Sequence, residues 1–220
     1  MAYNLLDLTS SAQDDLKDPS FSSTRLRRFF NHAQKKIFNT HTFKFCEKSV
    51  SGTLTVGDYT IEQQDDHQAT INGILIDPVN TSRFVVLDDT NYMVHRQFFD
   101  EFPDPSTQQQ GMPTYWTEFG DQIYFNIPVD KAYTFRQRYY RIPTDMSADT
   151  DVPDVPSVCR ELLEMWALYR SEKYRQNHDI AATYLQEFED ELEDMVLRYA
   201  PVIQNGPVEM RNVRKRISYS

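Results

Sequence analysis

The hydrophobic positions near the C-terminal end of the chain predict two helices packed as a hairpin. Residues 160–176 are apolar around much of a helical circumference, whereas residues 180–199 are apolar along one side. Between them lies the sequence QNHD, in which Asn177 favours a left-handed conformation and Asp179 favours a helix cap. Because the first helix is apolar on two sides, it needs a second packing partner, which we expect the rest of the chain to supply.

The second helix of this hairpin has one apolar and one acidic face. Its apolar positions recur every three or four residues: Ile180, Tyr184, Leu185, Phe188, Leu192, Met195, Val196 and Tyr199. The opposite face is predicted to be solvated and consists of Gln186, Glu187, Glu189, Asp190, Glu191, Glu193 and Asp194. We expect the core of the hairpin to be formed by Leu162, Trp166, Tyr184, Phe188, Leu192 and Met195.

The N-terminal segment has the same helical period. One helix is predicted over residues 4–16, and a second begins at a cap provided by Ser22 or Ser23 and runs to about Asn39. The second helix has a basic face, formed by Arg25, Arg27, Arg28, Lys35 and Lys36. This face is expected to be solvated, or else to meet the acidic face of the C-terminal helix or an acidic partner.

From His41 the hydrophobic period changes to two, which is typical of β-strands. The alternation continues to about residue 142 and predicts a compact antiparallel unit, either a small sandwich or an open barrel. A strand at 84–87 and a short helix capped by residues 88–90 are also expected within it. Turns are predicted at the dipeptides 51–52, 57–58, 72–73 and 120–121, of which the Asn-Gly pair at 72–73 is the strongest hairpin signal.

The predicted fold class is therefore α+β: a helical bundle, made of the N-terminal helices and the long C-terminal hairpin, with an inserted antiparallel β unit and an extended C-terminal tail. We expect N-terminal bundle helices at 1–40, the β unit at 41–142, an acidic Pro-rich linker at 143–156, the hairpin at 157–199 and the tail at 200–220.

The tail has no regular apolar period. Its basic residues are Arg211, Arg214, Lys215 and Arg216. A polar terminal segment without a core of its own is either disordered or docked on another surface, where it can add as a strand.

The net charge and the cysteine count exclude some classes of protein. The chain has 220 residues and a formal net charge of -10, which argues against wrapping nucleic acid but permits a surface that DNA passes without sticking. Cys46 and Cys159 are too few for a disulfide framework and are expected to be buried free thiols. No signal peptide and no membrane-spanning run is expected, so we expect a soluble protein made in a cytosol.

No catalytic or cofactor motif is recognised. The sequence has no phosphate-binding Gly-rich loop and no nucleophile elbow, and its five histidines lack metal-ligand spacing. The run Asp65-Asp66-His67 resembles a catalytic or metal cluster, but a polar loop is the simpler interpretation. We expect no enzyme activity, no metal and no cofactor.

The order of these segments resembles the head-to-tail adaptor (connector or tail-tubular) proteins of tailed bacteriophages. The likeness covers about residues 29–199 and depends mainly on the order and spacing of short motifs. These are GMPTYW at 111–116, YFNIP at 124–128, RYYRIP at 138–143, and DTDVPDVP at 149–156, which leads into ELL at 161–163.

The resemblance implies a virion protein, made in the host bacterial cytoplasm, that forms a ring of typically twelve copies. Such a ring joins the portal protein to a tail or nozzle protein, surrounds a channel for packaged DNA and contacts no membrane. Its basic tail, with Arg211, Arg214, Lys215 and Arg216, would reach the portal or the adjacent protomer. The channel face would carry Glu187, Asp190, Glu191 and Asp194, since an acidic lumen lets DNA slide; these acids could equally face outer solvent.

Other functions stay open at this point. One is an aromatic binding module for a glycan or peptide, which needs exposed rings among Tyr115, Trp116, Tyr124, Tyr133 and Tyr139. A second is an enzyme with an unrecognised site, which needs polar groups converging in one pocket. A third is a DNA-binding regulator that uses the basic helix at 25–36, which the net charge disfavours.

Overall fold

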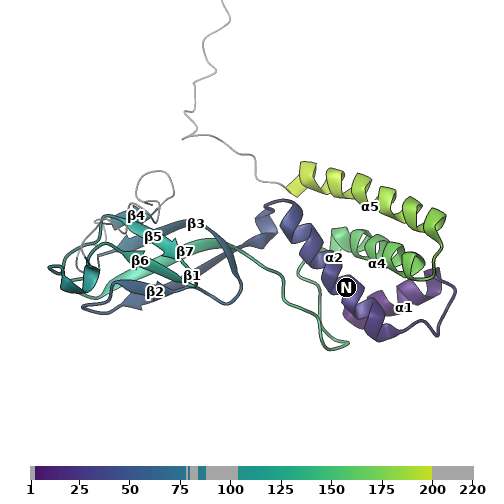
Figure 1. Cartoon of the computed structure of the whole chain (residues 1–220), viewed down its shortest axis with the longest axis horizontal. Coiled ribbons are helices and arrows are strands. Elements are labelled where there is room, and N and C mark those ends of the chain that lie inside the picture. Colours follow the sequence, from purple (N-terminus) through teal and green to yellow (C-terminus); the bar gives the residue numbers. More distant parts are fainter. Residues whose placement is uncertain (1–2, 78, 80–83, 88–103, 200–220) are drawn as a thin grey trace, which may run out of the picture.

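The computed structural model describes residues 3–77, 79, 84–87 and 104–199. Figure 1 shows a helical body at one end of the molecule and a β unit at the other, joined by extended chain. The fold is mixed helix and sheet, as predicted. No helix in these residues is long and apolar enough to cross a membrane. The expected short helix after residue 87 and the tail at 200–220 lie outside the described residues.

Both N-terminal helices begin at side-chain caps, and the cap of the second helix is the predicted Ser22. Helix α1 (Leu5–Asp15) starts with a capping box in which Asn4 and Asp7 exchange side-chain-to-backbone hydrogen bonds. Helix α2 (Ser23–Thr40) is capped by Ser22, whose Oγ accepts the backbone N–H of Arg25. A short 3-10 turn, η1 (Lys44–Cys46), then leads into the sheets.

The predicted hairpin is present. After a 3-10 turn, η3 (Ser157–Cys159), helix α4 (Arg160–Tyr174) packs against α5 (His178–Tyr199). In the turn of the hairpin, Asn177 was expected to take the left-handed conformation. This prediction was wrong, because Gln176 takes it instead, with φ of 65°. Asn177 instead donates its backbone and side-chain N–H groups to Glu172, and Asp179 lies in the first turn of α5.

Helix α4 is the centre of the body, and α1, α2 and α5 all pack on it. Helix α2 runs antiparallel to α4, since Arg25 stacks on Tyr174 while His32 contacts Trp166. The C-terminal end of α4 is also bound to the end of α1, where the carbonyl of Leu16 accepts a hydrogen bond from Arg175. The partner that α4 requires is therefore the N-terminal helix pair.

The core of this body joins all four helices. Of the expected hairpin core, Leu162, Trp166, Phe188, Leu192 and Met195 are buried, and Tyr184 is partly buried against them. Ile180 was expected on the apolar face but is 52% exposed, because it lies close to the turn, where α5 starts. The hydrophobic period otherwise identified the packed face of α5.

The β unit contains two antiparallel sheets. Its strands are β1 (Glu47–Leu54), β2 (Thr60–Glu62), β3 (His67–Ile76), β4 (Phe84–Leu87), β5 (Trp116–Phe119), β6 (Gln122–Phe125) and β7 (Tyr133–Arg141). The first sheet has the order β1-β7-β3-β4 and the second the order β2-β6-β5. A 3-10 turn, η2 (Pro105–Thr107), precedes β5.

Side chains from both sheets form a second core, so the unit is a sandwich. Leu54, Leu75 and Phe135 from the first sheet share this cluster with Trp116 and Phe125 from the second. Along β7 the residues alternate between buried and exposed, as the two-residue period requires.

Two of the predicted turns were wrong. Asn72 and Gly73 lie inside β3, where they pair with Arg138 and Gln137 of β7, and a shift in register lies between Thr70 and Asn72. The Asn-Gly pair therefore adjoins a bulge in a central strand rather than forming a hairpin. The dipeptide at 51–52 likewise lies inside β1. The Gly residues at 57 and 120 do occupy turns, with φ of 92° and 59°.

Candidate functional site

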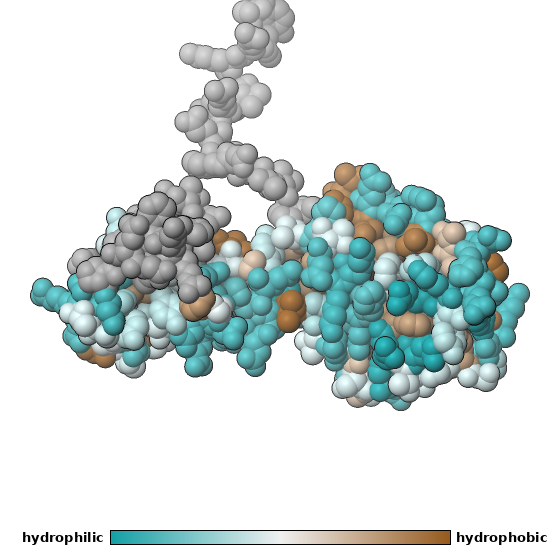
Figure 2. Space-filling view, viewed as in Figure 1, coloured by the Kyte–Doolittle hydropathy of each residue, from teal (hydrophilic) through white to brown (hydrophobic). Residues whose placement is uncertain are grey.

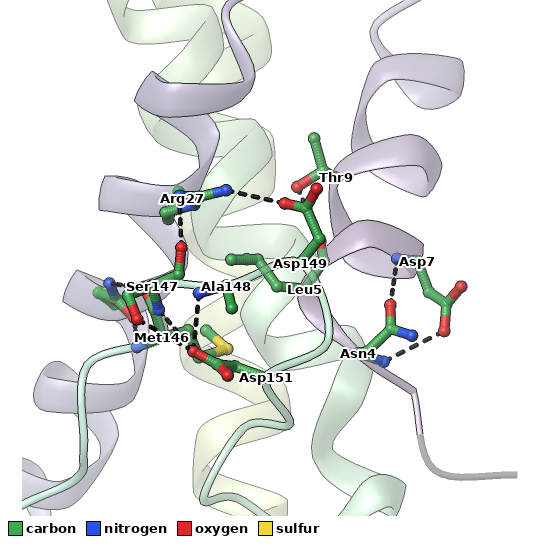
Figure 3. A network of polar contacts seen from close by, with 11 residues as sticks. Asn4, Leu5, Asp7, Thr9, Arg27, Met146, Ser147, Ala148, Asp149 and Asp151 are labelled. Atoms are coloured by element: carbon green, nitrogen blue, oxygen red, sulfur yellow. Dashed lines mark hydrogen bonds and ion pairs between the residues drawn. The ribbon is translucent and has the colours of Figure 1, made fainter.

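The acidic linker is bonded tightly to the helical body (Figure 3). Asn31 of α2 bonds both the carbonyl and the N–H of Met146, at 3.0 and 2.9 Å. Met146 itself is buried in the core of the body. The Asp154 N–H donates to Gln34 Oε1 at 2.7 Å, and Gln34 is completely buried. The linker is thus an integral part of the body, although its Pro and Asp content indicated only irregular chain.

The same linker completes the start of α1. A helix begins with four backbone N–H groups that have no intrahelical acceptor. Here Leu5 and Leu6 donate to the carbonyls of Asp151 and Asp149, at 2.9 and 3.0 Å, while Asp7 donates to the Asn4 side chain. Asp151 also accepts the N–H groups of Ala148 and Ser147, and these hydrogen bonds hold the pKa of its carboxyl below the usual value.

Some basic residues of α2 form ion pairs within the body, and others are exposed without one in the described residues. Arg27 pairs with Asp149 at 2.8 Å and Lys35 with Asp145 at 2.7 Å, so the acidic partner that the sequence suggested is in part the linker. Arg25 lies 3.6 Å above the ring of Tyr174. Arg28 and Lys36 are exposed and form no ion pair within the described part of the chain.

Arg28 lines a cleft of about 310 Å³ that is bounded by α2, the linker and α4, and we call it the α2 cleft. It is lined by Arg28, Phe29, Asn31, His32, Lys35, Asp145 and Arg170. Trp166 Nε1–H donates to His32 Nδ1 at 3.1 Å, so His32 is in the neutral form with its proton on Nε2. Burial lowers the pKa of His32, and the nearby charges of Arg170, Lys36 and Lys35 lower it further.

The acidic face of α5 is exposed, as predicted. Glu187, Asp190 and Asp194 are exposed and Glu191 is half-buried. Asp194 pairs with Arg198 at 3.6 Å, and Asp190 accepts a hydrogen bond from Gln186. Which of these carboxylates faces a DNA channel stays a prediction.

Three of the five rings expected for a binding platform are interior. Trp116, Tyr133 and Tyr139 are at most 2% exposed and belong to the interior of the β unit, while Tyr115 is 40% exposed. Since a glycan platform needs exposed coplanar rings, these three cannot be part of one.

The run at 65–67 belongs to a polar cluster of the β unit. Asp66 accepts hydrogen bonds from Lys48 and Tyr139, both at 2.7 Å; these lower the pKa of Asp66, although burial acts in the opposite direction. Burial lowers the pKa of His67, whose Nε2 lies 4.0 Å from Glu118. Over the described residues no group of three potential ligands is arranged to hold a metal ion.

Both cysteines are buried free thiols, as expected. Burial raises the pKa of Cys46 and of Cys159 to about 11, so neither is a reactive thiolate at neutral pH. The predicted tail site, with Arg211, Arg214, Lys215 and Arg216, lies outside the described residues.

The described residues thus form a helical body that is braced by its own linker, a β-sandwich, and outer helix faces of opposite charge. A family model described as SU10 adaptor protein matches residues 3–211, and the chain belongs to this family. Among curated proteins the chain has no match. The family confirms the resemblance to phage head-to-tail adaptors. The chain is accordingly a structural adaptor of a bacteriophage and a component of the virion.

Proposed function

We propose that copies of this chain form a ring, expected to be 12-fold, that joins the portal protein to a tail or nozzle protein. Membership of the adaptor family carries this proposal, and the four-helix body, with one shared core, supports it as a unit that can repeat around a ring. Segments 1–40 and 157–199 would form the ring wall, with 143–156 bracing it and 41–142 facing outward or toward the tail. Segment 200–220 would dock on the portal or on the adjacent copy.

The acidic face of α5 would line the DNA channel of this ring. Glu187, Asp190, Glu191 and Asp194 carry negative charge along one side of the helix, where little internal pairing neutralises it. A negative wall repels the phosphates of packaged DNA, so DNA would pass without adhering. The net charge of -10 is consistent with this passage role.

Electron microscopy of the purified chain mixed with the portal protein of the same virus tests the proposal. We expect a closed ring beneath the portal, with α5 at the inner wall. A portal that stays bare at saturating concentrations of the chain would overturn the ring proposal. A ring with α5 at its outer surface would overturn only the channel assignment.

The tail is tested in the same assay. Reversal of charge at Arg211, Arg214, Lys215 and Arg216 to Glu is expected to abolish portal binding if these residues hold the ring to its neighbour. The matched control changes Arg211, Arg214 and Arg216 to Lys, which keeps the charge and should preserve binding. Equal binding by both variants would exclude the basic tail as the docking element.

A further inference from the structure

The α2 cleft offers mainly hydrogen-bond donors and positive charge. Arg28 is exposed and has no ion-pair partner in the described residues, and Arg170 is held over the ring of Phe29 at 5.7 Å. His32 accepts from Trp166 through Nδ1, which leaves its Nε2–H free to donate toward the cleft. The one acid in the lining, Asp145, is already bound by Lys35 at 2.7 Å. This arrangement fits a carboxylate.

Helix α5 carries two carboxylates that the channel proposal does not use. Glu189 and Glu193 are exposed, lie one helical turn apart and form no ion pair in the part of the chain that the structure describes. Successive helical residues differ by roughly 100°, which places this pair on one flank of Asp190 and the pair Glu187 and Glu191 on the other. One helix can therefore present one acidic flank to a channel and the other to a neighbour.

A single copy cannot join the two surfaces. Helices α2 and α5 are both packed on α4 through their apolar faces, so their charged faces point away from the shared core. Figure 2 shows hydrophilic surface over these helices, with hydrophobic patches between them. When two different surfaces of one subunit complement each other, each copy can bind the next through a heterologous contact. Such contacts form a closed ring when the rotation from one subunit to the next divides a full turn evenly.

We propose that the α2 cleft, through Arg28, His32 and Arg170, binds Glu189 and Glu193 of a second copy of this chain. The inference rests on the proposed ring and specifies the contact from which it is built. Ion pairs between exposed side chains are individually weak, so the contact favours closure on a portal template over ring formation in free solution.

Charge exchange tests the contact in the portal-binding assay. We expect R28E/R170E and E189K/E193K each to lower ring occupancy on the portal about tenfold or more, because like charges then face each other. The combined four-residue variant restores opposite charges and should recover the ring. D14K/D15K changes two exposed acids of α1 and alters the net charge as E189K/E193K does, and it should leave the ring intact. Failure of the combined variant to recover would overturn the contact.

A second measurement uses the wild-type ring and does not depend on variant folding. A zero-length carbodiimide reagent should join Lys35 or Lys36 of one copy to Glu189 or Glu193 of another. In rings assembled from a mixture of unlabelled and ¹⁵N-labelled chains, a linked peptide pair that contains one labelled and one unlabelled peptide shows that the link is intermolecular. Rings that form without this link would refute the contact and leave the proposed function standing. Absence of any wild-type ring would overturn the proposed function first, and the contact with it.

Discussion

At the scale of single residues, two amides of α2 determine how the linker is held. Asn31 and Gln34 lie beside the apolar stripe and bond the backbone of the linker at Met146 and at Asp154. The sequence showed only polar residues next to a helical stripe. Their spacing places both on one side of the helix, and the local pattern did not identify the linker as their partner.

Replacement of Gln34 by Ala should destabilise the protein by about 2–3 kcal/mol, because it leaves a cavity and the Asp154 N–H without its acceptor. Urea unfolding measures the loss. The matched control is Lys35→Ala, which removes an exposed ion pair and should cost about 0–1 kcal/mol. Equal losses for the two variants would show that the linker is not held through Gln34.

The surroundings of His67 determine its pKa: its side chain is 9% exposed, and its Nε2 lies 4.0 Å from Glu118 of β5. Its Nε2 is 2.9 Å from Thr70 Oγ1, while Glu118 and Asp66 are the acids that face it. Burial lowers its pKa more than these acids raise it.

The folded state therefore favours neutral His67, and unfolding takes up a proton when the pH lies between the folded and unfolded pKa values. This contribution to stability is complete above the unfolded pKa and is lost as the pH falls through the folded pKa. In urea unfolding from about pH 8 to about pH 5, the wild type should lose more stability than His67→Gln. Parallel curves for the two proteins would exclude His67 as a source of the pH dependence.

At the scale of elements, the long helices followed from the sequence and the details of their junctions did not. Helix α5 is predicted by an apolar pattern that repeats over many residues, so the prediction of a helix stands even when one position is assigned to the wrong face. Its turn depends on a few backbone conformations, and hydrogen bonds to Glu172 placed Asn177 differently from its local preference.

The packing of α5 on α4 is tested by Phe188→Ala. Phe188 is 1% exposed, and its ring lies 4.9 Å from that of Trp166, so its loss should cost about 3–5 kcal/mol. Leu197→Ala on the same helix is the control, since Leu197 is 80% exposed and the change should stay within about 0.5 kcal/mol. Denaturant midpoints that shift equally would contradict the assigned face.

At the scale of the whole molecule, the helical body has a core of its own, to which all four helices contribute. On α5 the large side chains of Phe188, Leu192 and Met195 are buried, and full burial contributes about 1.5–3 kcal/mol for each before conformational entropy is subtracted. The proposed contact between copies consists of exposed charges, which contribute little individually. The contacts that stabilise the fold therefore lie within one subunit, whereas the proposed ring would be held by contacts between subunits.

We therefore expect the purified chain to sediment as a monomer and to form rings only when the portal protein is added. Analytical ultracentrifugation over a range of concentrations and salt conditions measures this. A stable dodecamer of the isolated chain would contradict the expectation, and it would mean that the subunit contact is stronger than exposed ion pairs provide.

The sequence by itself determined the elements and the class of protein. Periods of three to four and of two residues report which side of a helix or strand is buried, and this is a local property of the chain. Only the tertiary structure decided that residues 143–156 brace the body, that Trp116 and Tyr139 are interior, and that residues 72–73 continue a strand. These outcomes depend on contacts between residues far apart in the chain, where packing against β7 or α2 overrides local preference.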